Sequence, residues 1–249
     1  MRPLLLLLAA LAPLSPGAAE PLRVHIRSGP KSHGPGCHDH PAFLRDWPPL
    51  LRSLGAQAGG SDLPPTAEEL AGADVVVIHR QCGADMDDAE RGRLEAFARR
   101  GGGIVVIHAG IAANHTAGLD AVKDLVGGVW RPKVTRWREG PMELALAAHG
   151  HALGKGVADF GMDDEIYYDL DLRPDIQVVA TAPTPRRRGD GFESQPQVWA
   201  YERPGAQRAF VFVPGHRYAN FSRPDVRELL LRGIGWAGRR EAEFPPRAR

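Results

Sequence analysis

The apolar positions of this chain form short continuous runs separated by longer amphipathic segments. Three of the runs are rich in β-branched residues, which is typical of strands buried on both faces. They are Asp74–His79, Gly103–His108 and Arg208–Val213. Leu22–Arg27 is a shorter run that predicts the first strand. Because such strands alternate with helices along the chain, the pattern predicts a parallel sheet with helices on both faces.

Amphipathic segments predict the helices. Asp87 and Glu90 have the spacing of a capping box, and the apolar face that follows them ends at Gly101–Gly103. Thr66 predicts the start of a short helix that runs to Leu70. Another helix is predicted to begin near Ser222 and Asp225, and its apolar positions share one face: Val226, Leu229, Leu230, Gly233, Ile234 and Ala237.

Other segments depart from this alternation. Residues 134–201 contain apolar runs at 142–146, 176–180 and 198–201 without helices between them, which predicts an antiparallel extension of the same sheet. Residues 183–196, with three consecutive arginines, are expected to form an exposed loop, and 240–249 a frayed tail. The pair Pro48–Pro49 predicts that the first helix starts or kinks there.

The N-terminus has the pattern of a secretory signal peptide. Arg2 precedes an apolar stretch, Leu4–Ala12, that is much shorter than the roughly 20 residues needed to span a bilayer. Small residues follow, and cleavage is expected near Ala19. The sequence therefore predicts a signal peptide at 1–19, one domain at 22–238 and a tail at 239–249, in a periplasmic or secreted protein.

The net charge, the lengths of the apolar runs and the cysteine content limit which partners and binding sites the protein can have. The 31 basic and 30 acidic residues give a net charge of +1, which argues against a nucleic-acid-binding protein. No later apolar run is long enough to cross a membrane. Cys37 and Cys82 are compatible with one disulfide, two free thiols or soft metal ligands. The sequence leaves the oligomeric state open.

Histidines are concentrated where the predicted strands end. In open parallel sheets, ligands bind at the carboxyl ends of the strands, so residues at these positions are expected to form one cluster. His79 and His108 end two buried runs, and Val213–His216 follows the third. The loop after the first strand adds three more: His33, His38 and His40.

Such a cluster suits proton transfer or the binding of a divalent metal such as zinc. His38 and His40 are the candidate metal ligands, although the intervening Asp39 is equally well explained as a helix N-cap. Glu165, beside apolar and aromatic residues, is a candidate acid–base group. His115 and Tyr167 are candidate substrate-binding residues.

At this point several motifs, in their order and spacing, resemble the ThuA-like, or trehalose-utilization, family. They are His33–Gly36, His38–Pro41, Asp164–Tyr168, Pro214–His216 and Leu231–Ala237. The resemblance covers residues 22–238. It implies a flavodoxin-like, doubly wound and mostly parallel sheet related to class I glutamine amidotransferases. It also implies a role in carbohydrate catabolism, where relatives are linked to 3-keto-disaccharides such as ketotrehalose.

Two known chemistries are excluded by the sequence. An amidotransferase needs a nucleophilic cysteine at the turn after a central strand, but this turn is Ile107–Ile111 and contains no thiol. Nicotinamide binding is not expected, because no G-x-G-x-x-G motif follows the first strand.

The first hypothesis is therefore an enzyme that acts on a small carbohydrate, a sugar or 3-keto-glycoside. In it, Glu165 or His108 is the base, and the hydroxyl or oxyanion partners are His33, His79 and His216. The second hypothesis is a non-catalytic domain that binds carbohydrate or a protein partner through aromatic residues. Such residues are more often part of the core, and the candidates are Trp130, Trp137, Tyr167, Tyr168 and Trp199. A third hypothesis is a histidine-based metal carrier.

Overall fold

The computed structural model describes residues 20–147, 152–203 and 207–245. The predicted signal peptide, at 1–19, lies outside these residues, as do the last four residues of the predicted tail. Along the described chain the helices are α1 His40–Ser53, α2 Ala67–Ala71, α3 Asp88–Arg99, α4 Leu119–Val126 and α5 Pro224–Ala237. The strands are β1 Arg23–Arg27, β2 Gln57–Ser61, β3 Val75–Ile78, β4 Gly103–Ile107, β5 Gly128–Val129, β6 Arg136–Leu146, β7 Phe160–Tyr168, β8 Asp171–Leu172, β9 Gln177–Pro185, β10 Phe192–Glu202 and β11 Arg208–Phe212.

A mixed sheet organises the molecule. Its strand order is β2-β1-β3-β4-β11-β10-β9-β6-β7. The first five of these strands are parallel, and the remaining four continue the sheet in antiparallel pairs. This confirms the predicted α/β fold, with a mostly parallel, doubly wound sheet and an antiparallel extension.

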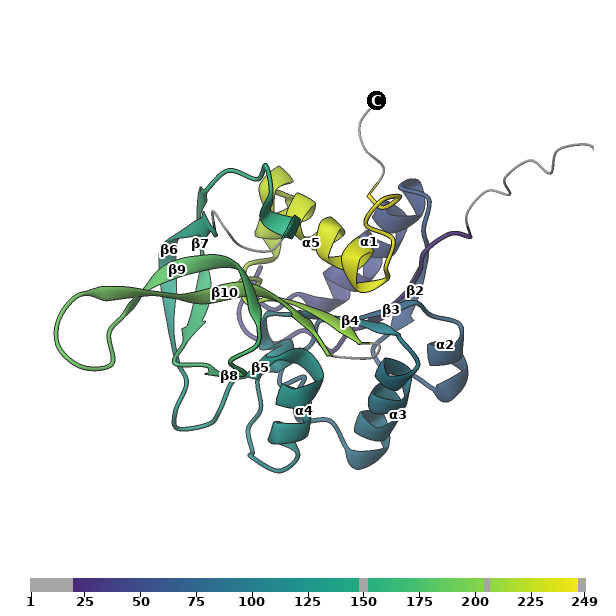
Figure 1. Cartoon of the computed structure of the whole chain (residues 1–249), viewed down its shortest axis with the longest axis horizontal. Helices are drawn as coiled ribbons and strands as arrows, with labels where there is room; N and C mark the ends of the chain where they lie inside the picture. The colour runs from purple at the N-terminus through teal and green to yellow at the C-terminus, as the bar shows by residue number, and fades with distance from the viewer. Residues whose placement is uncertain (1–19, 148–151, 204–206, 246–249) are drawn as a thin grey trace, which may run out of the picture.

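The helices cover both faces of the parallel half, with α1 and α5 on one face and α2, α3 and α4 on the other (Figure 1). Each face buries its own hydrophobic cluster. Phe43 and Leu51 of α1 pack with α5 against one side of the sheet, and Leu94 and Phe97 of α3 pack against the other. The continuous apolar runs of β3 and β4 are fully buried because both of their faces are covered.

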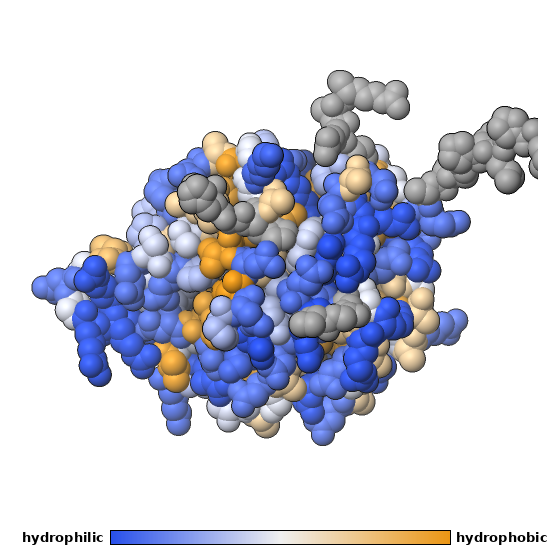
Figure 2. Space-filling view, in the orientation of Figure 1, coloured by the Kyte–Doolittle hydropathy of each residue, from blue (hydrophilic) through white to orange (hydrophobic). Residues whose placement is uncertain are grey.

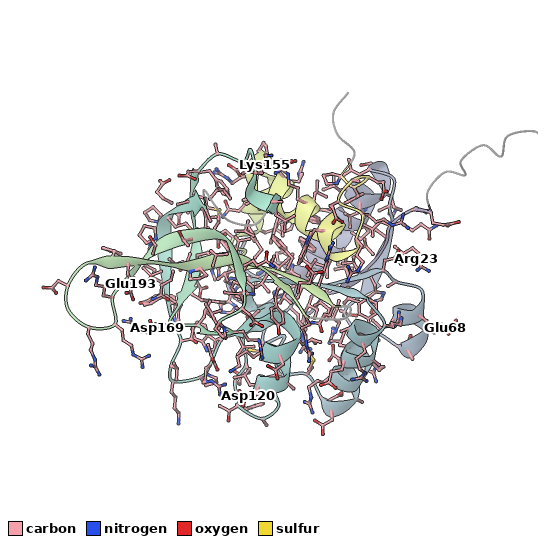
Figure 3. The ribbon with its side chains drawn as sticks, in the orientation of Figure 1. Arg23, Glu68, Asp120, Lys155, Asp169 and Glu193 are labelled. Atoms are coloured by element: carbon pink, nitrogen blue, oxygen red, sulfur yellow. The ribbon has the colours of Figure 1, made fainter. Side chains whose placement is uncertain are left out.

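Charged side chains lie around this core. Glu68, Asp120 and Glu193 are exposed at the periphery (Figure 3). Hydrophilic residues also dominate the face shown in Figure 2, where a narrower apolar strip crosses the middle. Among the described residues, none of the helices is both long and apolar enough to span a bilayer.

Several helix predictions are confirmed in detail. Thr66 caps α2 in a reciprocal capping box with Glu69. Asp39 caps α1 by accepting a hydrogen bond from the Ala42 amide, with Pro41 in the first turn. The predicted apolar face of α5 is buried throughout, although the helix begins at Pro224 without a side-chain cap.

Three sequence-based expectations were wrong. Helix α1 does not start at Pro48 and Pro49 but begins at His40 and continues through them, since Phe43 and Trp47 stack at 4.7 Å and hold it against the core on the N-terminal side of the prolines. Most of the predicted loop 183–196 forms the paired ends of β9 and β10. The beginning of the predicted tail is also packed rather than frayed, because Phe244 is buried against Gly235 of α5.

The parallel half contains a buried ion pair that the sequence pattern did not predict. Arg27, at the end of β1, lies with its Nε 3.0 Å from Glu90 Oε1, and both side chains are almost fully buried. Arg80 Nη1 lies 3.6 Å from the other Glu90 oxygen. Asp87 caps α3 as predicted, but Glu90 turns inward to these arginines instead of completing the capping box. Leaving the buried guanidinium of Arg27 without a counterion would cost more free energy than a second capping hydrogen bond at the helix surface would contribute.

We expect Glu90→Ala to lower the free energy of unfolding by about 3–5 kcal/mol, because it leaves Arg27 buried without its counterion. Glu95→Ala, on the half-exposed side of the same helix, is the matched control and should change it by less than about 0.5 kcal/mol. Chemical denaturation measures both values. Equal effects of the two substitutions would contradict a stabilising role for the buried pair.

Candidate functional site

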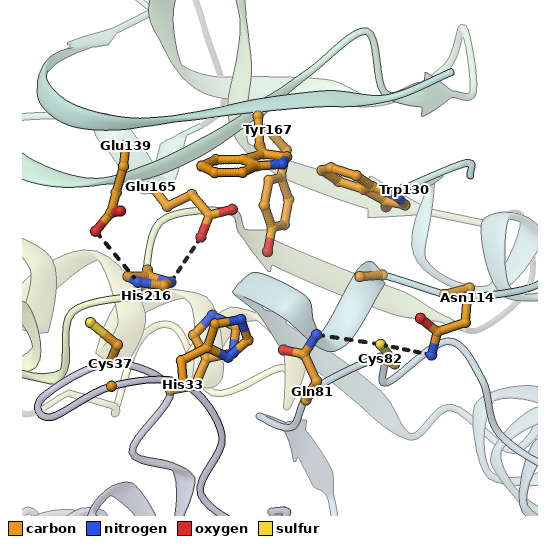
Figure 4. A pocket seen from close by; sticks show the side chains of 15 residues that line it. His33, Cys37, Gln81, Cys82, Asn114, Trp130, Glu139, Glu165, Tyr167 and His216 are labelled. Carbon is orange, nitrogen blue, oxygen red and sulfur yellow. Dashed lines mark hydrogen bonds and ion pairs between the residues drawn. The ribbon is translucent and has the colours of Figure 1, made fainter. Parts of the chain in front are cut away.

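A pocket of about 550 Å³ opens at the carboxyl ends of the parallel strands, between them and the antiparallel extension. Loops that follow β1, β3, β4 and β11 form one side, and β6 and β7 form the other (Figure 4). Its walls combine imidazole, carboxylate, amide, thiol and aromatic groups: His33, Gly34, Cys37, His38, Gln81, Cys82, Ala112, Ala113, Asn114, Trp130, Trp137, Glu139, Glu165, Tyr167 and His216.

His108 lies beneath the floor of this pocket. It follows β4 directly, and its φ of +52° is in the left-handed region that non-glycine residues rarely adopt. Its Nδ1 is 2.7 Å from the Val213 carbonyl oxygen, so Nδ1 carries the proton and donates it. Tyr167 stacks on the ring and places its hydroxyl 3.1 Å from Nε2. Burial lowers the pKa of His108 well below its ordinary value, so the ring is neutral and Nε2 accepts the hydrogen bond of the Tyr167 hydroxyl.

His38 meets His108 from the loop after β1. The two Nε2 atoms are 3.0 Å apart, and His38 Nδ1 is 3.3 Å from the Ser32 hydroxyl. The backbone of His38, at φ +43°, is held by a hydrogen bond from its amide to the carbonyl of His216. Burial, followed by the neighbouring imidazoles, lowers the pKa of His38 to about 3.

His216 stands between two carboxylates. Its Nδ1 lies 2.8 Å from Glu165 Oε2, and its Nε2 lies 3.5 Å from Glu139 Oε1 (Figure 4). Burial acts to lower the pKa of His216, but the close contact with Glu165 and the charge of that carboxylate outweigh it and raise the pKa overall. The preceding residue must be glycine, because Gly215 has φ +140° and a Cβ there would lie 3.1 Å from His108 Cβ.

Asp164 holds the loop that carries His216. Its fully buried carboxylate accepts hydrogen bonds from the backbone amides of Gly215, His216 and Arg217 at 2.9–3.2 Å. The Asn220 side chain and the amide of Glu165 donate as well, at 2.7 Å each. Asp164 therefore fixes both partners of the His216–Glu165 pair without lining the pocket itself.

The structure brings most of the predicted site residues together and separates others. His33 is exposed at the rim, with its ring 4.0 Å from that of His38, and Tyr167 lines the pocket. His79 is instead buried in the core beside Phe43 and Phe221, because its side chain enters the layer between the sheet and α1.

Two further predictions need correction. His40 is buried behind His38, with its Nδ1 2.9 Å from the Pro30 carbonyl oxygen, and it is not among the convergent metal-type donors. His115 lies on the surface, 73% exposed, with its Nε2 3.9 Å from Asp85, and does not line the pocket. Both residues were grouped with the cluster from their order along the chain, but the start of α1 turns His40 to the interior and a surface loop carries His115 away from the pocket.

Several residues that line the pocket were not predicted from the sequence. Glu139 lies on the first part of β6, before the apolar run at 142–146 from which this strand was predicted, although the alternation of exposure along the whole strand is regular. Gln81 and Asn114 come from loops and place amide nitrogens 3.4 and 3.2 Å from the sulfur of Cys82. No periodic signal marks such loop positions. Cys82 and Cys37 are both free thiols.

One group of donors suits a metal ion. His38, His108, Glu165 and His216 each offer a ligand atom, and these four atoms lie within 4.8 Å of one another. A second group, Cys37, Glu139 and His216, shares one imidazole with the first. The predicted metal ligand His38 therefore stays in the candidate set, and residues from β7 and the loop after β11 join it.

We expect Asp164→Asn to displace the His216 loop, because an amide nitrogen would replace one acceptor oxygen beneath several N–H donors. The variant should lose about 1–3 kcal/mol of stability. Asp163→Asn is the matched control, since that neighbouring side chain is mostly exposed. Chemical denaturation and the imidazole NMR signals of His216 measure the effect. Unchanged signals in Asp164→Asn would contradict the positioning role.

Comparison with known proteins places this fold and site in a family. The family model for ThuA, described as trehalose utilisation, matches residues 54–237. A ThuA-like protein from Bacteroides uniformis is similar in structure, with a TM-score of 0.69 at 18% identity, over 90% of this chain and 94% of that one. No curated protein sequence matches the chain.

More distant structures share only the fold. A protein from Thermoplasma acidophilum, named for GMP synthase, has a TM-score of 0.52 at 14% identity over 89% of this chain and 98% of that one. A β-galactosidase from Rahnella sp. R3 has a TM-score of 0.52 at 15% identity over 86% of this chain but 31% of the enzyme. The family match covers most of the sequence, and the chain therefore belongs to the ThuA family of trehalose utilisation, which gives it a family-level role in carbohydrate metabolism.

Proposed function

We propose that this protein is an exported enzyme of carbohydrate catabolism that acts on a sugar or a 3-keto-glycoside by histidine and glutamate chemistry. Export is supported by the signal-peptide pattern of residues 1–19. The substrate class is supported by the family, whose description is trehalose utilisation. The reaction is supported by the carboxylate and imidazole groups at the floor of the pocket.

The observation that carries the proposal is the pairing of Glu165 with buried imidazoles at the floor of an open pocket. Glu165 comes from the antiparallel extension and is 12% exposed, whereas His108 and His216 come from the parallel half and are buried. Glu165 Oε2 is 2.8 Å from His216 Nδ1 and 3.7 Å from His108 Nε2. A carboxylate that is accessible from the pocket and lies close to imidazole nitrogens is suited to proton transfer.

A 3-keto-glycoside has acidic C–H bonds next to its carbonyl group. Glu165 takes the proton from this carbon, and the C–H electron pair forms a C=C bond as the carbonyl π pair moves onto oxygen. The negative charge on that oxygen is stabilised by the positive charge of the cluster, either a proton on His216 or a divalent ion. Return of the proton from Glu165 to the other face of that carbon gives an isomer. In an elimination, the carbonyl group re-forms and the C=C pair shifts towards the next carbon, whose substituent leaves with its bonding pair and takes the proton from Glu165.

The upper walls of the pocket suit a sugar. Trp130 and Trp137 line it, and Trp137 is 56% exposed, although the sequence analysis favoured a core position for both. Apolar faces of sugar rings pack against indole rings, while planar amides bind hydroxyl groups. Gln81 and Asn114 lie on the opposite side of the pocket from the aromatic residues Trp130 and Tyr167 (Figure 4).

The exposed indole of Trp137 also supports a second candidate, a non-catalytic carbohydrate-binding domain. Such a domain needs the aromatic wall but not the acid–base group beneath it. The two candidates therefore respond differently to a substitution that removes only the ionisable oxygen of Glu165.

We expect Glu165→Gln to reduce turnover of 3-keto-disaccharides by about 100-fold or more, because the amide cannot accept the proton. Sugar affinity should change little, since the side chain keeps its size. Glu193→Gln, an exposed residue of the β9–β10 hairpin, is the control and should retain full activity. Assays compare 3-keto-disaccharides with their unoxidised forms, and calorimetry measures binding.

Full turnover by Glu165→Gln would remove this residue from the reaction. Sugar binding without turnover of any compound, in the unmodified protein, would instead favour the binding domain.

A further inference from the structure

We propose that His38, His108 and His216 bind one divalent first-row metal ion, of the zinc class, at the floor of the pocket. Nε2 of His38, Nε2 of His108 and Nδ1 of His216 are the ligand atoms, and Glu165 remains beside the ion as the proton acceptor. The ion would be the electrophile of the proposed reaction, so its catalytic role rests on the proposed function. Metal binding itself is a separate property and is tested separately.

The spacing of the donor atoms fits a single ion. Three imidazole nitrogens at about 2.1 Å from one tetrahedral zinc ion lie about 3.4 Å from each other. His38 Nε2 and His108 Nε2 are 3.0 Å apart, and the donor atoms of all three residues and Glu165 lie within 4.8 Å of one another. The three ligands come from three loops at the same edge of the sheet, so the fold itself assembles the site.

The second nitrogen of each imidazole has an oxygen partner. His108 Nδ1 donates to the Val213 carbonyl at 2.7 Å, and His38 Nδ1 lies 3.3 Å from the Ser32 hydroxyl. His216 Nε2 lies 3.5 Å from the carboxylate of Glu139. Histidine ligands in metal sites usually have this outer oxygen partner, which fixes the ring and directs the other nitrogen to the ion.

Hydrogen bonds within the described chain leave one of the three inner nitrogens, Nδ1 of His216, without a partner. Because His108 Nδ1 holds the proton, its Nε2 presents a lone pair, which lies 3.1 Å from the Tyr167 hydroxyl and 3.0 Å from the Nε2 of His38. His216 Nδ1 is buried and makes no hydrogen bond of acceptable geometry, although Glu165 Oε2 is 2.8 Å away. A cation at the centre would satisfy all three lone pairs at once.

Glu165 is better suited to the base than to a fourth protein ligand. Its carboxylate is partly open to the pocket, and catalytic zinc sites keep one position free for water or substrate beside three protein ligands. The open position faces the same pocket as the tryptophan wall. A sugar carbonyl or hydroxyl oxygen bound there would lie next to Glu165. Imidazole ligands favour zinc, iron, nickel or copper over magnesium and calcium.

Titration of the chelator-treated full chain with Zn²⁺, followed by calorimetry, tests the site. We expect one ion per chain, and the absorption bands of a tetrahedral centre when Co²⁺ replaces Zn²⁺. His38→Ala and His216→Ala should weaken Zn²⁺ binding by more than the roughly 10- to 100-fold typical of an outer-shell loss, and Ser32→Ala should weaken it within that range. His115→Ala, which removes an exposed imidazole, is the control and should bind as the unmodified chain does.

Glu165→Gln tests whether Glu165 is the base or a metal ligand. If it is the base, the variant should bind Zn²⁺ with an affinity within about 10-fold of the unmodified chain, while turnover is lost. Absence of Zn²⁺ binding to the unmodified chain would overturn the site, as would equal binding by His38→Ala and His115→Ala. Loss of the ion from Glu165→Gln would overturn the three-histidine assignment. Far-UV circular dichroism identifies any variant that fails to fold, and Ser32→Ala then provides the test.

The two proposals can fail independently. A bound ion without turnover of any sugar would refute the proposed function and leave the metal site. Turnover that persists after chelation, in protein shown to be free of metal, would overturn the role of the ion as the electrophile and leave an acid–base enzyme.

Discussion

The buried carboxylate of Asp164 is the contact on which the rest of the site depends. It lies on β7, in the antiparallel half of the sheet, yet most of its hydrogen bonds come from the loop after β11, the neighbour of β4 in the parallel half. A buried carboxyl group needs several donors to offset its loss of hydration. Because these donors are the backbone amides of Gly215–Arg217, the same contact sets the position of His216.

Alternation along β7 then produces the pair at the floor of the pocket. Adjacent residues of a strand point to opposite sides, so Asp164 is buried towards the loop while Glu165 faces the pocket. Glu165 and His216 thus meet because one residue anchors the loop and the next contacts it. The arrangement combines a rigid support with a partly open carboxylate, which the proposed proton transfer requires.

The fold alone does not determine this chemistry. Structures named for GMP synthase and β-galactosidase share the arrangement of strands and helices at identities of 14% and 15%. The same fold therefore accommodates unrelated functions, and the reaction has to be inferred from the side chains at the strand ends. In this chain the turn after β4 presents an imidazole with a left-handed backbone, where the sequence has no thiol. Its neighbours are imidazoles and carboxylates, which suit proton transfer and metal binding.

By itself, the sequence determined the parallel half of the fold and part of the site. Buried runs such as those of β3 and β4 are recognisable because both of their faces are covered, and His38, His108 and His216 could be grouped because parallel strands end at one edge. The tertiary structure alone decided that His79 and His40 face the interior and that Glu90 neutralises Arg27. It also decided that Asp164 and Glu139 belong to the site. These outcomes depend on which loop carbonyls, amides and charges surround each side chain, and that depends on contacts between segments far apart in the chain, which no local periodicity encodes.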